Sequence, residues 1–247
     1  MRLRLIACDV LYREICAVVA RSPNQVDVEF LPKGLHDRRA SEMRLTLQQA
    51  VDGVDRAAYD AVLMGYGLCG NGLAGLTART VPLVVPRAHD CITLFLGDRQ
   101  RYLNYFQQNP GVYYATTGWI ERGTRLGDLS QPGLERYGLA MSREEMVAKY
   151  GEENARFLEE EIGAYKKHYR QYTFIQMGVE PDDHFERLTR DAARERGWKF
   201  EKVCGDMALI EGLVNGPWDD ARYLVVEPGW RVVSSYGDGV IAAEPAA

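Results

Sequence analysis

Residues 3–19, LRLIACDVLYREICAVV, contain one complete strand–loop–helix unit. The first five residues are almost all apolar, which is typical of a short strand buried on both faces. The strand is expected to stop at Cys8 and Asp9, and the apolar residues that follow recur at helical spacing. The unit therefore predicts an α/β fold, in which helices join and cover the strands.

The same order of elements recurs along the chain. Further strands are expected at 26–31, 61–64, 81–85, 112–116, 172–177, 198–203 and 223–226, and helices at about 41–54, 142–169, 183–196 and 209–214. Apolar strands that alternate with helices predict a mainly parallel sheet, or sheets, with helices on both faces. Two organisations fit. One has two similar Rossmann-like lobes, residues 1–120 and 142–247, joined by a loop over 121–141; the other is a single domain over 1–247.

The composition excludes several classes of partner. The chain has 247 residues and a formal net charge of -5, and its basic residues form no sustained run, so no nucleic-acid partner is expected. No stretch approaches the roughly 20 apolar residues of a membrane helix, and the first apolar run is too short for a signal peptide. We therefore expect a cytoplasmic protein, in which the five cysteines are thiols, metal ligands or nucleophiles.

Four cysteines fall where expected strands end: Cys8, Cys69, Cys91 and Cys204. The carboxyl ends of parallel strands meet at one edge of a sheet, where α/β proteins bind their ligands. These four residues are therefore candidate ligands of one metal centre, either Zn²⁺ or an iron–sulfur cluster. No Cys-x-x-Cys pair is present to select the metal. The fifth cysteine, Cys16, lies within the first helix and is expected to pack as a small apolar residue.

A glycine-rich loop, GYGLCGNG at residues 65–72, surrounds the second of these cysteines. Such a loop lets backbone amides approach a ligand closely, or lets the chain turn with positive φ. Gly67, Gly70, Asn71 and Gly72 are therefore candidate cofactor-binding residues. The loop is neither a Rossmann fingerprint nor a Walker loop, since a cysteine occupies the turn that follows the first two glycines and no Gly-Lys-Ser/Thr is present.

The segment Arg87-Ala-His-Asp-Cys91 supplies the candidate catalytic residues, which are Arg87, His89 and Asp90. His89 and Cys91 are two residues apart, so both side chains could reach one ion, or His89 could act as a base toward a cysteine. The structural alternative for His89, and equally for His36, is a core or capping hydrogen bond. Arg87 could bind an anionic substrate or pair with Asp90.

These motifs, together with Gly205-Asp206, resemble a prokaryotic family known as domain of unknown function 1638, over about residues 3–230. Members of that family are often encoded near corrinoid-dependent methyltransferases and their activators. The resemblance therefore implies a role in methyl-group metabolism and a possible corrinoid protein or methyltransferase as partner. The chain lacks the corrinoid-binding Asp-x-His-x-x-Gly pattern, so cobalamin is not expected as its own cofactor.

Three hypotheses follow from the sequence. The first is a cytoplasmic metalloprotein that acts on a small-molecule substrate, as a metal-dependent transferase or lyase. The second is a metal-free enzyme with Cys69 or Cys91 as nucleophile and His89 as base. The third is a protein that delivers a cofactor or metal to a methyltransferase.

Overall fold

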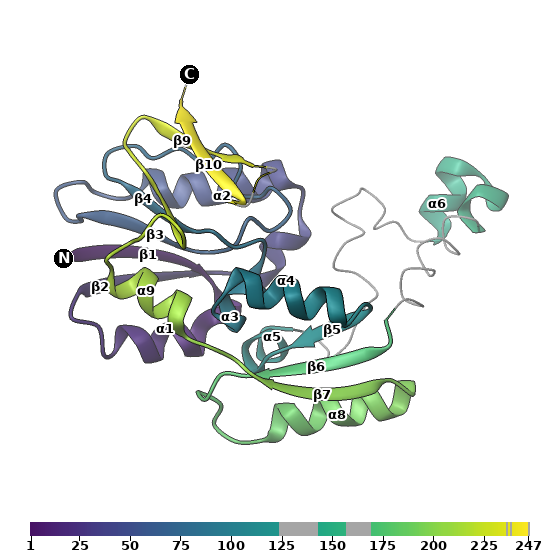
Figure 1. Ribbon diagram of the computed structural model, residues 1–247. Coiled ribbons are helices and arrows are strands. Elements are labelled where there is room, and N and C mark those ends of the chain that lie inside the picture. Colours follow the sequence, from purple (N-terminus) through teal and green to yellow (C-terminus); the bar gives the residue numbers. More distant parts are fainter. Residues whose placement is uncertain (124–142, 157–168, 236, 238, 247) are drawn as a thin grey trace.

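The structure, a computed structural model, describes residues 1–123, 143–156, 169–235, 237 and 239–246 (Figure 1). Its strands are β1 (Arg2–Cys8), β2 (Gln25–Leu31), β3 (Ala61–Gly65), β4 (Leu83–Pro86), β5 (Val112–Ala115), β6 (Gln171–Gln176), β7 (Lys199–Cys204), β8 (Tyr223–Val226), β9 (Trp230–Ser234) and β10 (Ile241–Pro245). Its α-helices are α1 (Tyr12–Val19), α2 (Ala40–Asp52), α3 (Cys91–Leu96), α4 (Arg99–Gln108), α5 (Thr117–Glu121), α6 (Arg143–Tyr150), α8 (His184–Arg196) and α9 (Ala208–Asn215), and its 3₁₀ helices are η1 (Asp9–Leu11) and η2 (Lys33–Asp37). The mixed α/β class expected from the sequence is confirmed.

The central sheet has five strands in the order β2-β1-β3-β4-β8. The pairs β1–β2, β1–β3 and β3–β4 are parallel, whereas β8 runs antiparallel to β4. Ala7 pairs with Gly65, and Leu63 pairs with Val84. The strands β1, β3 and β4 therefore end at the same edge of the sheet, and the loops that follow them lie side by side.

Helices cover both faces of this sheet. α1 and α9 contact each other on one face, and α2 lies on the other (Figure 1). The side chains of Leu5, Ile6 and Leu63 are completely buried between these layers. Burying an aliphatic side chain of this size contributes about 2 kcal/mol, so the sheet interior supplies much of the stabilisation of the fold.

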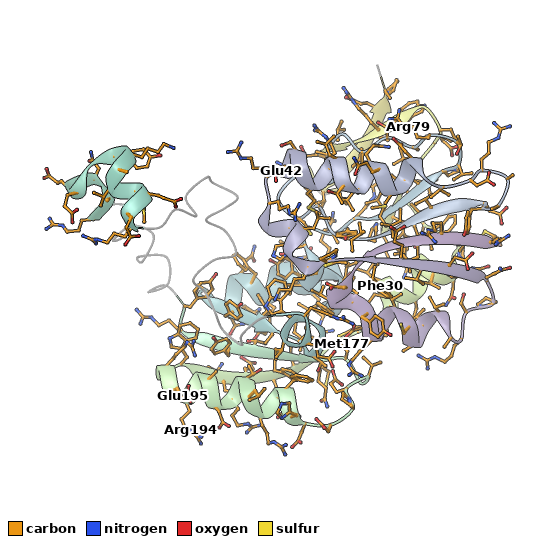
Figure 2. All side chains as sticks on the ribbon, turned by 180° about the vertical axis from the view of Figure 1, so that it is seen from behind. Phe30, Glu42, Arg79, Met177, Arg194 and Glu195 are labelled. Carbon is orange, nitrogen blue, oxygen red and sulfur yellow. The ribbon has the colours of Figure 1, made fainter. Side chains whose placement is uncertain are left out.

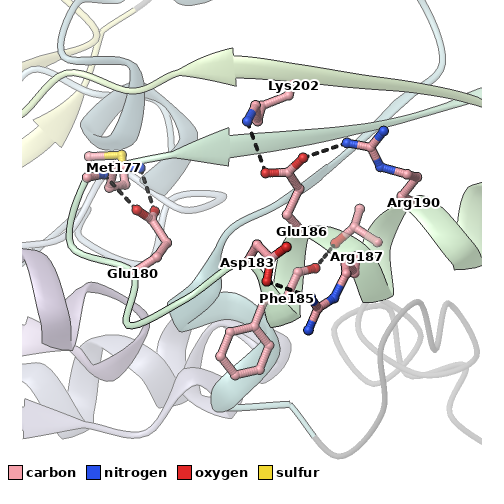
Figure 3. A network of polar contacts seen from close by, with 10 residues as sticks. Met177, Glu180, Asp183, Phe185, Glu186, Arg187, Arg190 and Lys202 are labelled. Atoms are coloured by element: carbon pink, nitrogen blue, oxygen red, sulfur yellow. Dashed lines mark hydrogen bonds and ion pairs between the residues drawn. The ribbon is translucent and has the colours of Figure 1, made fainter.

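A second sheet has three parallel strands in the order β5-β6-β7. α8 packs on β6 and β7, with Arg194 and Glu195 on its exposed face (Figure 2). An ionic contact joins this helix to the sheet, because the carboxylate of Glu186 accepts hydrogen bonds from Arg190 and Lys202 (Figure 3). The two sheets meet around Met177, which is buried in the main core.

The chain crosses between the two sheets. β5 precedes residue 121 and joins the second sheet, while β8 comes late in the chain and returns to the first.

The sequence analysis did not anticipate α3, α4 and α5, or the hairpin of β9 and β10. Most of the expected loop over 121–141 and much of the expected helix over 142–169 lie outside the described residues. In the described part of the chain, no helix combines the length and apolar character that crossing a bilayer requires.

Candidate functional site

A cavity of about 360 Å³ opens where the carboxyl edge of the central sheet faces the second sheet. One wall comes from the ends of β1, β3 and β4 and the loops that follow them. The other comes from β5, α5 and Tyr169, which lies just before β6. The lining residues are Cys8, Val10, His36, Gly65, Tyr66, Gly67, Cys69, Gly70, His89, Asp90, Cys91, Ile92, Val112, Tyr113, Tyr114, Trp119 and Tyr169.

Three of the four candidate cysteines line this cavity. Cys8 is the last residue of β1, Cys69 lies in the loop after β3, and Cys91 is the first residue of α3. The three sulfur atoms interact electrostatically. Burial, the charge of Asp90 and the charges of Cys69 and Cys8, in that order, raise the pKa of the Cys91 thiol well above its usual value. Without a cation beside it, Cys91 therefore stays a neutral thiol at neutral pH.

The loops after β3 and β4 are held against each other through Gly67. A Cβ atom at Gly67 would lie 2.6 Å from the Cα atom of Asp90 and 2.7 Å from its carbonyl carbon. On the same side, the amide of Leu68 donates to the carbonyl of Ala88 at 2.8 Å, and the amide of Cys69 donates to the carbonyl of His89 at 2.9 Å. This pairing of two loops brings Cys69 and the start of α3 to one place.

The backbone at Cys69 has an unusual conformation. Cys69, Gly70 and Asn71 have φ values of 45°, 63° and 70°, so three consecutive residues occupy the left-handed region. Glycine and asparagine adopt this conformation readily, but a cysteine there costs on the order of 1 kcal/mol. The loop therefore holds Cys69 in a backbone conformation that is unfavourable for cysteine. Strained residues of this kind cluster at functional sites.

Asp90 orients the start of α3. Its carboxylate accepts hydrogen bonds from the amides of Ile92 at 3.0 Å and Thr93 at 3.3 Å, and so caps the helix. Its other oxygen accepts a hydrogen bond from the hydroxyl of Tyr102 at 3.0 Å. Burial, only partly offset by these hydrogen bonds, raises the pKa of Asp90. The geometry gives this predicted catalytic residue a clear structural task, which is to fix Cys91 at the cavity.

The two histidines predicted near the site both line the cavity. His89 is exposed at its rim, and its carbonyl is the one that accepts from Cys69. His36 lies in η2, where its Nδ1 atom forms a hydrogen bond with the carbonyl of Lys33 and its ring lies 5.4 Å from that of Trp119. His36 is thus already engaged with its own turn, whereas His89 is exposed to solvent.

The structure does not bring the fourth candidate cysteine to this cavity. Cys204 is exposed at the carboxyl end of β7, where it pairs with Gln176 at the end of β6. The cavity instead faces the opposite end of the second sheet, where Val112 begins β5 and Tyr169 precedes β6. Sequence reasoning recognised the strand end, but it could not tell which sheet that strand belongs to.

Arg87 and two of the loop residues also lie outside the cavity lining. Arg87 donates to the carbonyls of Asp220, Gly239 and Ile241 and to the carboxylate of Asp220, and so ties the end of β4 to the C-terminal region. Of the predicted cofactor-binding residues, Gly67 and Gly70 line the cavity, whereas Asn71 and Gly72 do not. Gly72 instead packs on Met43 of α2.

The cavity has an aromatic wall, which we define as Tyr66, Tyr113, Tyr114, Trp119 and Tyr169. The sequence analysis did not anticipate it. The sequence did contain a feature that could have identified Tyr66 as a site residue, because Tyr66 stands between Gly65 and Gly67, the two glycines that hold the loop in place. Burial, followed by the charges of Cys8 and Cys69, raises its pKa. The other members depend on how the second sheet packs, which local sequence patterns do not specify.

The described residues contain no group of three or more His, Cys, Asp or Glu side chains arranged to hold a metal ion. A single Zn²⁺ ion binds thiolate sulfurs at about 2.3 Å, so three ligands of one ion must lie very close together. The cavity sulfurs share a wall and interact electrostatically without meeting that condition.

The fold and the cavity thus define an α/β protein with a thiol-lined, aromatic-walled site at a sheet edge. A family model described as "Protein of unknown function (DUF1638)" matches residues 30–214, and the chain belongs to this family. The matched region contains Cys69 and Cys91, while Cys8 precedes it. Comparison with curated proteins and with solved structures gave no match.

Proposed function

We propose that Cys8, Cys69 and Cys91 hold a metal centre in the cavity and that the protein acts on a small molecule bound beside it. The observation that carries the proposal is the meeting of three thiols from three separate strand ends in one cavity. Thiolates are the ligands preferred by zinc and by iron–sulfur clusters, and a bound cation lowers the pKa of a thiol. The raised pKa of Cys91 is therefore compatible with a ligand that ionises only when metal binds.

An iron–sulfur cluster fits these residues better than a single zinc ion does. In a cluster each cysteine binds a different iron, so its ligands stand farther apart than those of one ion. That spacing suits three sulfurs that line the same cavity without forming a ready site for one ion. A cluster held by three cysteines would supply an iron able to act as a Lewis acid toward a substrate, as a lyase requires. Zinc, in a transferase, is the alternative metal.

The test is the metal content of protein purified without oxygen. We expect about four irons and an absorption shoulder near 400 nm, roughly where thiolate-bound clusters absorb. Changing Cys8, Cys69 or Cys91 to serine should lower the iron content at least about tenfold, since each change removes a ligand. Matched controls are Cys204→Ser and Cys16→Ser, because both thiols are exposed and neither lines the cavity, so iron should be retained.

Each outcome of this experiment has a definite meaning. One equivalent of zinc with no iron would contradict the iron–sulfur cluster and support zinc as the metal. Protein without iron or zinc above trace amounts would contradict the proposal. Equal loss of iron in Cys204→Ser would contradict the choice of ligands, because Cys204 ends a strand of the other sheet.

A metal-free cysteine enzyme is the second candidate function. It is supported by the position of His89, which lines the same cavity as Cys69 and Cys91 and could act as base. The raised pKa of Cys91 disfavours that residue as the nucleophile and leaves Cys69. On this alternative one thiol should react with iodoacetamide much faster than the others, and Cys8→Ser should leave that reactivity unchanged.

The setting that we propose for this chemistry is cytoplasmic methyl-group metabolism, with a corrinoid protein or methyltransferase as partner or as recipient of a delivered cofactor. The support is the family to which the chain belongs and the resemblance described above. Co-purification with a corrinoid methyltransferase from the same cell would test it.

We also propose that the second sheet and α8 form a lobe similar to the first. Support comes from the small separate core of Tyr172, Ala192 and Ala193.

A further inference from the structure

Tyr66 is a buried residue of the cavity, and its hydroxyl has no hydrogen-bond partner within the described part of the chain. Its side chain is 3% exposed, and no described atom accepts from or donates to its hydroxyl. Buried hydroxyls are nearly always paired, because removal from water without a replacement bond is costly. The same residue lines the cavity beside Cys8 and Cys69. An unpaired donor at this place points to a ligand that completes it.

The backbone on both sides of Tyr66 is fixed. A Cβ atom at Gly65 would lie 2.5 Å from the Cβ atom of Ala7, and one at Gly67 would lie 2.6 Å from the Cα atom of Asp90. The chain is thus held against β1 on the N-terminal side of Tyr66 and against the loop after β4 on its C-terminal side. A donor held in this way loses little freedom when a ligand binds, which favours a specific hydrogen bond.

The charges around the cavity restrict the ligand. No lysine or arginine is among the lining residues of the described chain, while three thiols and the carboxylate of Asp90 are. An anionic ligand would meet the carboxylate of Asp90 and would find no lysine or arginine among the described lining residues. Much of the remaining surface is apolar and aromatic, from Tyr113, Tyr114 and Trp119. An uncharged molecule with an apolar body and an oxygen acceptor matches this surface.

We propose that Tyr66 donates a hydrogen bond to an oxygen atom of the substrate, and that this substrate is a small uncharged carbonyl or hydroxyl compound. The inference rests on the proposed function in that it places the substrate in this cavity, but it does not depend on which metal the sulfurs hold. Tyr66 is assigned a binding role, because it lines the cavity beside Cys8 and Cys69 and its buried hydroxyl has no hydrogen-bond partner among the described residues.

The test compares three probes of similar size that differ in charge: benzamide, benzoate and protonated benzylamine. Their affinities for the full-length, anaerobically purified protein are measured by titration calorimetry or ligand-observed NMR. We expect benzamide to bind at least about tenfold more tightly than either charged probe. Tyr66→Phe should weaken benzamide binding about tenfold, as the loss of one buried hydrogen bond does, and should leave the metal content unchanged.

Tyr172→Phe is the matched control. Tyr172 is fully buried and its hydroxyl is also unpaired, but it does not line the cavity. Its replacement should leave benzamide affinity within about twofold, because only the position of the lost hydroxyl differs. An effect of equal size in both variants would show that removing any buried phenol hydroxyl disturbs binding, and it would overturn the assignment of Tyr66.

Further outcomes separate this inference from the proposed function. Preference for benzoate or benzylamine, binding of no probe, or unchanged benzamide binding in Tyr66→Phe would overturn the inference whatever the metal content. Protein that binds benzamide through Tyr66 but contains no metal would overturn the metal centre and support the inference. Should Tyr66→Phe fail to fold, the order of the three probes on the unaltered protein still decides the charge of the ligand.

Discussion

Gly67→Ala is expected to lower the free energy of unfolding by about 3 kcal/mol and to abolish binding of the proposed metal centre. The added methyl group would lie 2.6–2.7 Å from three backbone atoms of Asp90. Backbone atoms cannot turn aside as the end of a long side chain can, so the loops after β3 and β4 must separate. That separation would break the hydrogen bonds from Leu68 to Ala88 and from Cys69 to His89. Cys69 and Cys91 would then lie too far apart to share one centre.

Chemical denaturation followed by circular dichroism measures the first effect, and elemental analysis measures the second. Gly34→Ala is the control, because a Cβ atom at Gly34 would meet nothing within 4 Å. It should change stability by less than about 0.5 kcal/mol and leave the metal in place. If Gly67→Ala retained both its stability and its metal, the contact with Asp90 would not be what positions the sulfurs.

The second large effect concerns pH. The protein should lose up to about 3 kcal/mol of stability as pH rises from 4.5 to above 7, because of Glu14 on α1. Glu14 is completely buried, and its two oxygens have no hydrogen-bond partner among the described residues. Burial raises its pKa from 4.5 to about 7, and the charges of Glu180 and Glu121 add to the rise, whereas the backbone amide of Glu14 itself and, to a smaller extent, Arg13 oppose it. The folded protein therefore holds this proton more tightly than the unfolded chain does.

The neighbours of Glu14 cannot relieve its burial. Arg13 is engaged by Glu121, which accepts from its Nε atom at 2.9 Å. Glu180 accepts from the amides of Met177 at 2.6 Å and Gly178 at 2.8 Å (Figure 3). Since these groups are already paired, ionised Glu14 would remain an uncompensated buried charge. Its stabilising contribution is therefore complete below pH 4.5 and disappears as pH passes 7.

Glu14→Gln removes the ionisable group and tests this directly. The variant should be more stable than the unaltered protein by about 3 kcal/mol at pH 8 and by less than about 1 kcal/mol at pH 5. Unfolding by urea at several pH values gives the comparison, with Glu227→Gln as control because Glu227 is exposed. Parallel pH profiles for Glu14→Gln and the unaltered protein would mean that Glu14 does not set the dependence.

Local sequence patterns predicted much of this architecture. The ends of β1, β3 and β4 could be read from apolar runs that stop at polar or glycine-rich segments, and the parallel register places those ends together. The approach of Cys8, Cys69 and Cys91 follows from these local features. The antiparallel course of β8 could not be read in this way, because an apolar run carries no information on strand direction.

Long-range packing explains what the sequence did not reveal. Cys204 ends a strand as expected, yet its strand pairs with β6 rather than with the central sheet. Tyr113 and Tyr114 belong to a short strand that looked unremarkable in the sequence. They reach the cavity only because the second sheet docks with its amino end toward the sulfurs. Such docking depends on many weak contacts between distant segments, which no local pattern records.

The division of the cavity between two sheets separates two kinds of evolutionary change. The sulfurs stand at the ends of strands of the central sheet or just after them, whereas Tyr113 and Tyr114 come from β5 of the second sheet. Substitutions in the second sheet can reshape the chamber without moving a thiol. Relatives of this protein could thus diverge in the molecules they accept while they retain the same three thiols, and selectivity could be re-engineered from β5 alone.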